Sequence, residues 1–131
     1  HTSCENNILF LTSDDINSQE KEKCVDIIGR ITKDANFNIY IKPHYALDEI
    51  VLANFVEMLK NVLKSNVVIL EGSIPIETYY ETLSFKHMIC QRFTSAIVNA
   101  KFIFGDELEC VVINKDGIPS EMLHELEISI L

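Results

Sequence analysis

A lysine, a proline and a histidine stand together in the segment Lys42-Pro43-His44. An ammonium group and an imidazole can bind a phosphate, and an imidazole can also protonate an oxygen as it leaves. In a simpler interpretation, Pro43 only turns the chain and His44 is solvated. Both interpretations stay open on the basis of this segment alone.

Two adjacent hydroxyls, on Thr94 and Ser95, come directly before the apolar segment Ala96-Ile97-Val98, for which a helix is expected. Unpaired N–H groups and the positive end of the dipole at a helix N-terminus attract phosphates. Capping of the helix by one of these residues explains the same pair. Capping and phosphate binding are compatible with each other.

Three carboxylates are candidates for polar roles. Glu77 follows Pro75 and Ile76 where a helix is expected to start, and it can accept hydrogen bonds from the two hydroxyls of a ribose. Asp14 and Asp15 follow the first apolar segment, and either can accept a proton from an acceptor hydroxyl. Equally, Glu77 can be a first-turn glutamate, and the aspartates can belong to a solvated loop.

The composition indicates the class of protein. The 131 residues, 47% hydrophobic and 24% charged, predict one globular domain with a single core. The apolar runs are too short to cross a bilayer and the first residues do not resemble a signal peptide, so a soluble, cytoplasmic domain is expected. Four widely spaced cysteines without a CxxC pair predict neither a disulfide scaffold nor a metal site.

The net charge of −9 disfavours nucleic-acid binding, so an anion has to bind in a local pocket.

Short apolar segments alternate with amphipathic ones along the chain. Segments 7–11 and 66–70 are short, mostly apolar runs and predict buried strands. Further strands are expected at residues 37–41, 86–90, 101–105 and 109–114.

Apolar residues at three- and four-residue intervals predict the helices. Asn17 is expected to cap the first helix together with Glu20, and a second helix is expected from Leu47. Shorter helices are expected over residues 76–83 and 96–100, and Pro119 is expected to open a last one.

This alternation predicts an α/β fold with a doubly wound, Rossmann-like and mainly parallel sheet that has helices on both faces. Ligands of such folds bind beyond the carboxyl ends of the strands. The loops expected at that edge are residues 13–15, 42–45, 71–77 and 91–95, which hold most of the reactive side chains.

Three segments in this order, Lys42-Pro43-His44, Ile74-Pro75-Ile76-Glu77 and residues 93–101, resemble a known family. They are similar to the donor-binding domain of bacterial CMP-sialic acid-dependent sialyltransferases, especially lipooligosaccharide sialyltransferases and their polysialyltransferase relatives. Those enzymes carry a His-Pro motif, a downstream Pro-x-Glu element and a Ser/Thr-Ser pair that opens a helix. Two positions differ, because Tyr45 follows His44 where the family has proline and Thr94 replaces a serine.

The resemblance implies a way of binding the donor, CMP-sialic acid. Lys42 lies where the family has a residue near the cytosine, and Glu77 where it has the ribose-binding carboxylate. The pair Thr94-Ser95 matches the hydroxyls that bind the phosphate. Pro43 and Ile76 lie within the matching motifs and are expected to contact the donor too.

The resemblance also implies an inverting displacement without a metal or cofactor. His44 matches the histidine that contacts the donor phosphate and acts as general acid on the departing CMP. Either Asp14 or Asp15 can serve as the base, unless the base lies in another domain.

Enzymes of this kind resemble two-domain GT-B glycosyltransferases, in which an acceptor half faces a donor half. Residues 1–131 are therefore expected to form the nucleotide-sugar-binding domain alone, inactive without the acceptor-side domain. The implied acceptor is a cell-surface glycan such as lipooligosaccharide. Contact with the inner membrane face has to come from the absent half or from the acceptor lipid, and a homodimer stays open.

Two other classes of function stay open. A receiver-type signalling domain is also a doubly wound α/β unit of this length, and Asp14, Asp15 and Lys115 fit its pattern. However, Glu71 stands where its phosphorylated aspartate should end the third strand. The other class is a non-enzymatic interaction module in which the same residues are only caps and turns.

Overall fold

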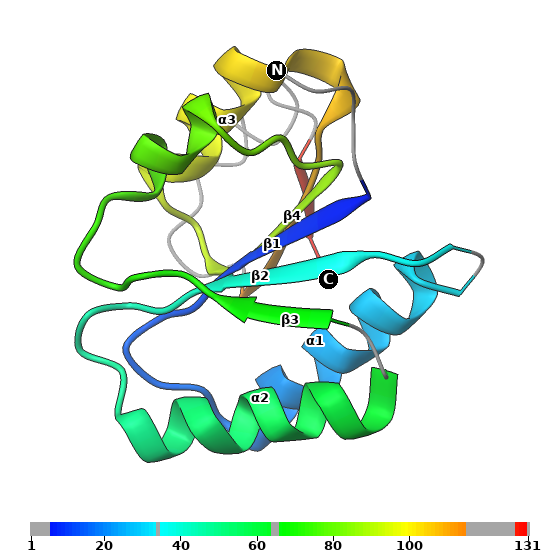
Figure 1. Ribbon diagram of the computed structural model, residues 1–131, viewed down its shortest axis with the longest axis vertical. Coiled ribbons are helices and arrows are strands. Elements are labelled where there is room, and N and C mark those ends of the chain that lie inside the picture. Colours follow the sequence, from blue (N-terminus) through cyan, green and yellow to red (C-terminus); the bar gives the residue numbers. More distant parts are fainter. Residues whose placement is uncertain (1–5, 34, 64–65, 115–127, 131) are drawn as a thin grey trace.

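The computed structural model describes residues 6–33, 35–63, 66–114 and 128–130. In this part of the chain, parallel strands form one six-stranded sheet in the order β3-β2-β1-β4-β5-β6 (Figure 1). The strands are β1 (Asn7–Leu11), β2 (Asn38–Lys42), β3 (Asn66–Ile69), β4 (His87–Arg92), β5 (Glu109–Asn114) and β6 (Ile128–Ile130). This is the strand order of a Rossmann-like sheet, and the predicted fold class is confirmed.

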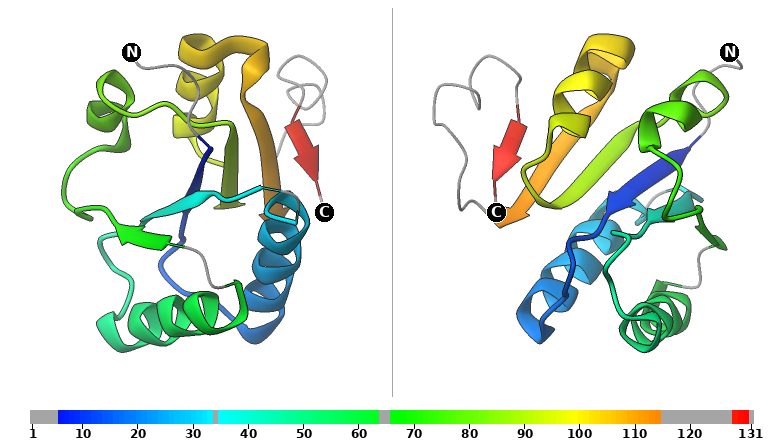
Figure 2. Two further views of the ribbon diagram at one scale, coloured as in Figure 1. Left: turned by 45° about the vertical axis from the view of Figure 1, so that its right-hand side comes forward. Right: turned by 90° about the vertical axis from the view of Figure 1, so that its left-hand side faces the viewer.

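Helices cover both faces of the sheet, as expected for parallel strands joined by crossovers. They are α1 (Ser18–Ile31), α2 (Glu49–Leu63) and α3 (Ser95–Phe104), with the 3-10 helices η1 (Ile76–Glu81) and η2 (Gly105–Glu107). α1 and α2 pack on one face, and α3 and η1 pack on the other (Figure 2).

The central strand β1 is buried on both faces because its side chains alternate between them. Ile8 and Phe10 belong to the core beneath α1 and α2. Leu9 and Leu11 belong to the core beneath α3 and η1. The prediction of a fully buried strand at this position is confirmed.

The start of α1 is fixed by the reciprocal pair of hydrogen bonds that the sequence predicts. The Glu20 N–H donates to the Asn17 side-chain oxygen over 2.8 Å, and the Asn17 N–H donates to Glu20 Oε1 over 3.1 Å. The pair satisfies two of the N–H groups that a helix start leaves open.

The prediction that β3 is buried is wrong. β3 is an edge strand, and the Ile69 side chain is 49% exposed. An apolar segment of four residues can form either a central or an edge strand, because the neighbour that would cover it comes from elsewhere in the chain.

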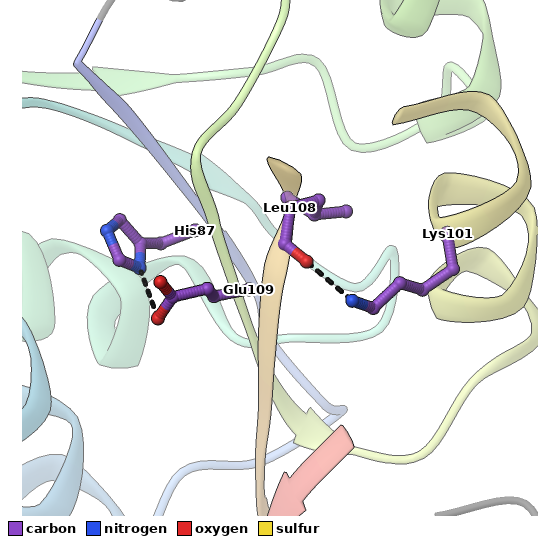
Figure 3. Close-up of polar contacts among 4 residues, drawn as sticks. All are labelled: His87, Lys101, Leu108 and Glu109. Carbon is purple, nitrogen blue, oxygen red and sulfur yellow. Dashed lines mark hydrogen bonds and ion pairs between the residues drawn. The ribbon is translucent and has the colours of Figure 1, made fainter. Parts of the chain in front are cut away.

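The prediction of a strand at residues 101–105 is also wrong. These residues complete α3 and begin η2, and Gly105 ends α3 with a φ of 66°, a conformation that favours glycine. The Lys101 ammonium donates to the Leu108 carbonyl over 2.6 Å and ties the last part of α3 to the start of β5 (Figure 3). The helix expected over residues 76–83 is the shorter 3-10 helix η1.

A polar pair lies at the amino ends of β4 and β5, the edge opposite the carboxyl ends. His87 Nδ1 is 3.9 Å from Glu109 Oε2 (Figure 3). Burial lowers the pKa of His87, although the charge of Glu109 acts in the opposite direction.

Two further features concern the end of the chain and its helices. The helix expected after Pro119 lies outside the described residues, and the sequence analysis did not predict β6. Within the described ranges, none of the helices has the length and apolar character that a membrane crossing requires.

Candidate functional site

The strand order creates a ligand-binding position between β1 and β4. From β1 the sheet extends through β2 to β3, and the chain then returns to β4 on the other side of β1. Loops that leave the two strands at such a switch point turn to opposite faces and open a crevice. A cavity of about 380 Å³ lies there, lined by residues 11–13, 42–44, 76–77 and 92–96. All four loops that the sequence analysis selected contribute to it.

His44 lies in the loop after β2 and is held by two hydrogen bonds. Its backbone N–H donates to the Thr12 hydroxyl over 2.8 Å, and its ring Nδ1 accepts from the Ala46 N–H over 3.0 Å. Because Nδ1 uses its lone pair in this way, the proton of the neutral ring lies on Nε2. Tyr45 stacks on the imidazole with ring centroids 4.4 Å apart. The loop therefore presents Nε2–H as a hydrogen-bond donor.

Thr94 and Ser95 stand at the start of α3, and both line the cavity. Thr94 is the N-cap, and its hydroxyl oxygen accepts from the Ala96 N–H over 3.3 Å. A hydroxyl that accepts in this way keeps its proton to donate to a ligand. Ser95 is the first residue of α3 and is exposed in the cavity. Capping and exposure to a ligand thus coexist, as the sequence analysis allowed.

Glu77 and Lys42 lie on the side of the cavity formed by η1 and the end of β2. The Lys42 ammonium donates to the Gly72 carbonyl over 2.8 Å. Burial lowers the pKa of Lys42, while the charges of Glu71 and Glu77 raise it. Glu77 Oε2 accepts from the Asn99 side-chain amide over 3.0 Å. The carboxylate is therefore held from α3 while it lines the cavity.

Apolar side chains complete the wall. Pro43 and Ile76 are buried, and both line the cavity. Leu11, Phe93 and Ala96 line it as well. Apolar walls with a few polar groups are typical of sites for organic ligands.

A comparison with protein families gives a match that includes every part of this site. Residues 5–111 match the family model of alpha-2,8-polysialyltransferase (POLYST), and every residue that lines the cavity falls within the match. The chain belongs to the alpha-2,8-polysialyltransferase family. It thus carries a sialyltransferase-type glycosyltransferase domain. A comparison with curated proteins found no significant match.

Asp14 and Asp15 of this polysialyltransferase-family chain do not line the cavity. Both are exposed after β1, next to Ser13, which does line it. The Asp14 carboxylate accepts from the Ser13 hydroxyl over 3.0 Å. The structure therefore brings His44, the η1 start and the α3 start together but leaves the two aspartates beside the site.

Gln91 fixes the loop after β1 against β4, and sequence analysis missed it. Its side chain is fully buried, with Oε1 accepting from the Ser13 N–H over 2.8 Å and Nε2 donating to Glu20 Oε1 over 3.0 Å. Nε2 also donates to the Asp15 carbonyl. The sequence analysis placed Gln91 in a loop after a strand that ended at residue 90, whereas β4 continues to Arg92. The buried position of the amide therefore could not be recognised.

Three other residues of the site were also missed. Thr12 holds the backbone of His44, Asn99 holds Glu77, and Arg92 lines the cavity at the end of β4. Arg92 belongs to the selected loop 91–95, so its charge was the available signal. Thr12 and Asn99 act on residues 32 and 22 positions away, and no local pattern reveals such partners.

The side chains that could bind a metal ion are dispersed. In the part of the chain that the structure describes, no three histidine, cysteine, aspartate or glutamate side chains are grouped to hold one. The groups that can hold an anion at the cavity are the imidazole, the hydroxyls, two cationic side chains and the start of α3.

Proposed function

We propose that this polysialyltransferase-family chain is the donor-binding domain of an inverting sialyltransferase, with CMP-sialic acid as its donor. The observation that carries the proposal is the placement of His44, Glu77 and the Thr94-Ser95 pair around one cavity at the switch point of the sheet. An imidazole, a carboxylate and hydroxyls at a helix start suit the phosphate and ribose of a nucleotide. The cavity volume of about 380 Å³ also suits a small organic ligand.

In this proposal the phosphate lies at the start of α3. The hydroxyls of Thr94 and Ser95 donate to it, and His44 donates from the loop after β2 through Nε2–H. The positive end of the α3 dipole adds to the attraction. This arrangement gives an anion a local site on a chain with a net charge of −9.

The nucleoside lies along η1 and the end of β2. Glu77, held by Asn99, accepts hydrogen bonds from the ribose hydroxyls. Lys42 lies beside the cytosine, and Pro43 and Ile76 contact the apolar parts of the nucleotide. Support for this orientation comes from the fact that Lys42, Pro43, Ile76 and Glu77 all line the same cavity.

Transfer proceeds by direct displacement at the anomeric carbon. The acceptor hydroxyl oxygen forms the new bond from the face opposite the phosphate, while the bond between the anomeric carbon and the phosphate oxygen breaks. The departing CMP takes the electron pair of that bond and leaves as a phosphate anion, which His44 stabilises through the hydrogen bond from Nε2–H. The general-acid role that the resemblance implies requires the imidazolium form, whose Nδ1–H cannot accept from the Ala46 N–H. Donors aimed at the phosphate stabilise its growing negative charge, so the proposed step uses neither a metal nor a cofactor.

The proton of the acceptor hydroxyl passes to a carboxylate. Asp14 and Asp15 are the candidates in this chain, because they are exposed beside Ser13. A second domain that faces the cavity in a GT-B arrangement is the alternative source of the base. We propose that the acceptor binds between the two domains, which leaves the domain of residues 1–131 inactive alone.

The proposed acceptor is a bacterial cell-surface glycan such as lipooligosaccharide, reached at the cytoplasmic face of the inner membrane. The name of the matching family adds a second class, a chain of α2,8-linked sialic acid. Both acceptors carry a sugar hydroxyl that can attack the donor. A homodimer is compatible with either acceptor.

Calorimetric titration of the chain with CMP tests donor binding. Wild-type protein should bind CMP, and His44→Ala should weaken binding about tenfold because one hydrogen bond to a charged group is lost. His87→Ala is the matched control, since this histidine lies at the opposite edge of the sheet and should leave the affinity unchanged. Absence of binding at millimolar CMP, or equal affinities of the two variants, would contradict the proposal.

A further inference from the structure

Arg92 is a cationic side chain of the cavity to which neither the family resemblance nor the proposed mechanism gives a role. It ends β4, lines the cavity and is exposed. Side chains alternate along a strand, so Arg92 lies on the same side of the sheet as Cys90, the side covered by α3 and η1. It also stands two residues before Thr94, the cap of α3.

The other cationic or protonatable groups of the lining already have partners. Lys42 donates to the Gly72 carbonyl and is close enough to Glu71 and Glu77 for both charges to raise its pKa. His44 has its Nδ1 occupied by Ala46. The Arg92 guanidinium, in contrast, has no hydrogen bond or ion pair with the side chains or carbonyls that the structure describes, although its backbone belongs to the β4–β5 pairing. Its charge is available to a ligand.

We propose that Arg92 binds the carboxylate of the sialyl group of the donor. This inference rests on the proposed function. In CMP-sialic acid the carboxylate and the phosphate oxygen are attached to the same anomeric carbon, so the two anionic groups lie side by side. A residue that binds the carboxylate must therefore stand next to the phosphate site at the start of α3, where Arg92 stands. The planar guanidinium matches a carboxylate through two parallel hydrogen bonds.

This role makes Arg92 a specificity-determining residue. The hydroxyls, His44 and the α3 dipole serve the phosphate, which every CMP ester has. Only a donor with a carboxylate at the anomeric carbon can form an ion pair with the Arg92 guanidinium. A donor without that carboxylate leaves the charge of Arg92 unpaired. The preference for a sialyl donor over other nucleotide esters is then set by one side chain.

Three ligands and two variants test this assignment by calorimetry on the whole chain. The ligands are CMP, CMP-sialic acid and the methyl ester of CMP-sialic acid, in which the carboxylate charge is removed. Arg92→Gln should lower the affinity for CMP-sialic acid about 10- to 100-fold. The affinities for CMP and for the ester should fall less than about 2-fold. Arg92→Lys should fall in between, because it keeps the charge and loses the paired geometry. Arg30→Gln is the matched control, with the same change of charge on the last turn of α1.

The outcomes separate this inference from the proposed function. Equal losses for all three ligands would place Arg92 at the phosphate and overturn the carboxylate assignment, as would unchanged affinities. In both cases binding of CMP by wild-type protein leaves the proposed function standing. If wild-type protein binds no CMP, the proposed function falls and the assignment of Arg92 falls with it. Because Arg92 is exposed, unfolding midpoints of the variants should match wild type, which shows that losses of affinity are local.

Discussion

Several residues of this site both stabilise the local structure and line the cavity where the ligand is proposed to bind. Thr94 caps α3 and lines the cavity, and Thr12 lines the cavity while it accepts a hydrogen bond from the His44 backbone. Ser95 lines the cavity without capping the helix. The two hydroxyls of the Thr94-Ser95 pair can therefore be separated experimentally.

Ser95→Ala and Thr94→Val should have different effects. Ser95→Ala should weaken CMP binding about fivefold, through the loss of one donor, and leave the unfolding temperature unchanged. Thr94→Val should weaken CMP binding and also lower the free energy of unfolding by about 1 kcal/mol, because the cap is lost. Calorimetry and thermal unfolding measure the two quantities. A fall in stability for Ser95→Ala with unchanged CMP affinity would assign Ser95 to structure alone.

At the scale of elements, the connection between β1 and β4 decides the shape of the site. The two strands pair in parallel, and their following loops supply residues 12–13 and 92–96 of the lining. Gln91 joins these loops through its bonds to Ser13, Asp15 and Glu20. The buried amide thus connects the end of β4 to the start of α1.

Gln91→Leu should be strongly destabilising. Leucine has a similar size but leaves the Ser13 N–H and the Asp15 carbonyl without their partner, at roughly 1–3 kcal/mol for each group that stays buried. It also removes one of the two donors to Glu20 Oε1, which keeps the bond from the Asn17 N–H. We expect a loss of about 3 kcal/mol or more in urea unfolding. The matched control is Gln19→Leu on the exposed face of α1, which should change stability by less than about 0.5 kcal/mol. Similar losses for both variants would show that the Gln91 contacts contribute little.

At the scale of the whole molecule, one sheet joins two cores. Cys24 lies in the core beneath α1 and α2, whereas Cys90 and Cys110 lie in the core beneath α3 and η1. Burial raises the pKa of the Cys24 and Cys90 thiols far above the usual range and that of Cys110 to about 11. Since the thiolate is the reactive form, these cysteines report on opening of each core.

Alkylation with iodoacetamide at pH 8 should not modify Cys24, Cys90 or Cys110 in the folded protein. In increasing urea all three should become reactive at one midpoint, because β1 contributes side chains to both cores and a single domain unfolds cooperatively. Peptide mass spectrometry measures the modification of each cysteine. Modification of Cys24 at a lower urea concentration than the other two would show that the two faces open separately.

Local patterns were sufficient to predict most elements and part of the site. The apolar segment of β1, the Asn17–Glu20 pair and the hydroxyl cap of α3 each depend on neighbours within a few residues. Such signals are complete in the sequence. The same reasoning failed at residues 101–105, whose apolar side chains suit a strand or a helix equally, and at the exposed edge strand β3.

The sequence by itself determined that the chain alternates strands and helices, and that His44, Glu77, Thr94 and Ser95 lie at strand ends or helix starts. Only the tertiary structure decided which of these ends meet, because strand order depends on packing between distant segments. The Ser13 to Gln91 hydrogen bond, for example, joins residues 78 positions apart. The roles of Thr12, Asn99 and Arg92 arise in the same way. Each of these residues can act only because the folded sheet places it next to a distant loop.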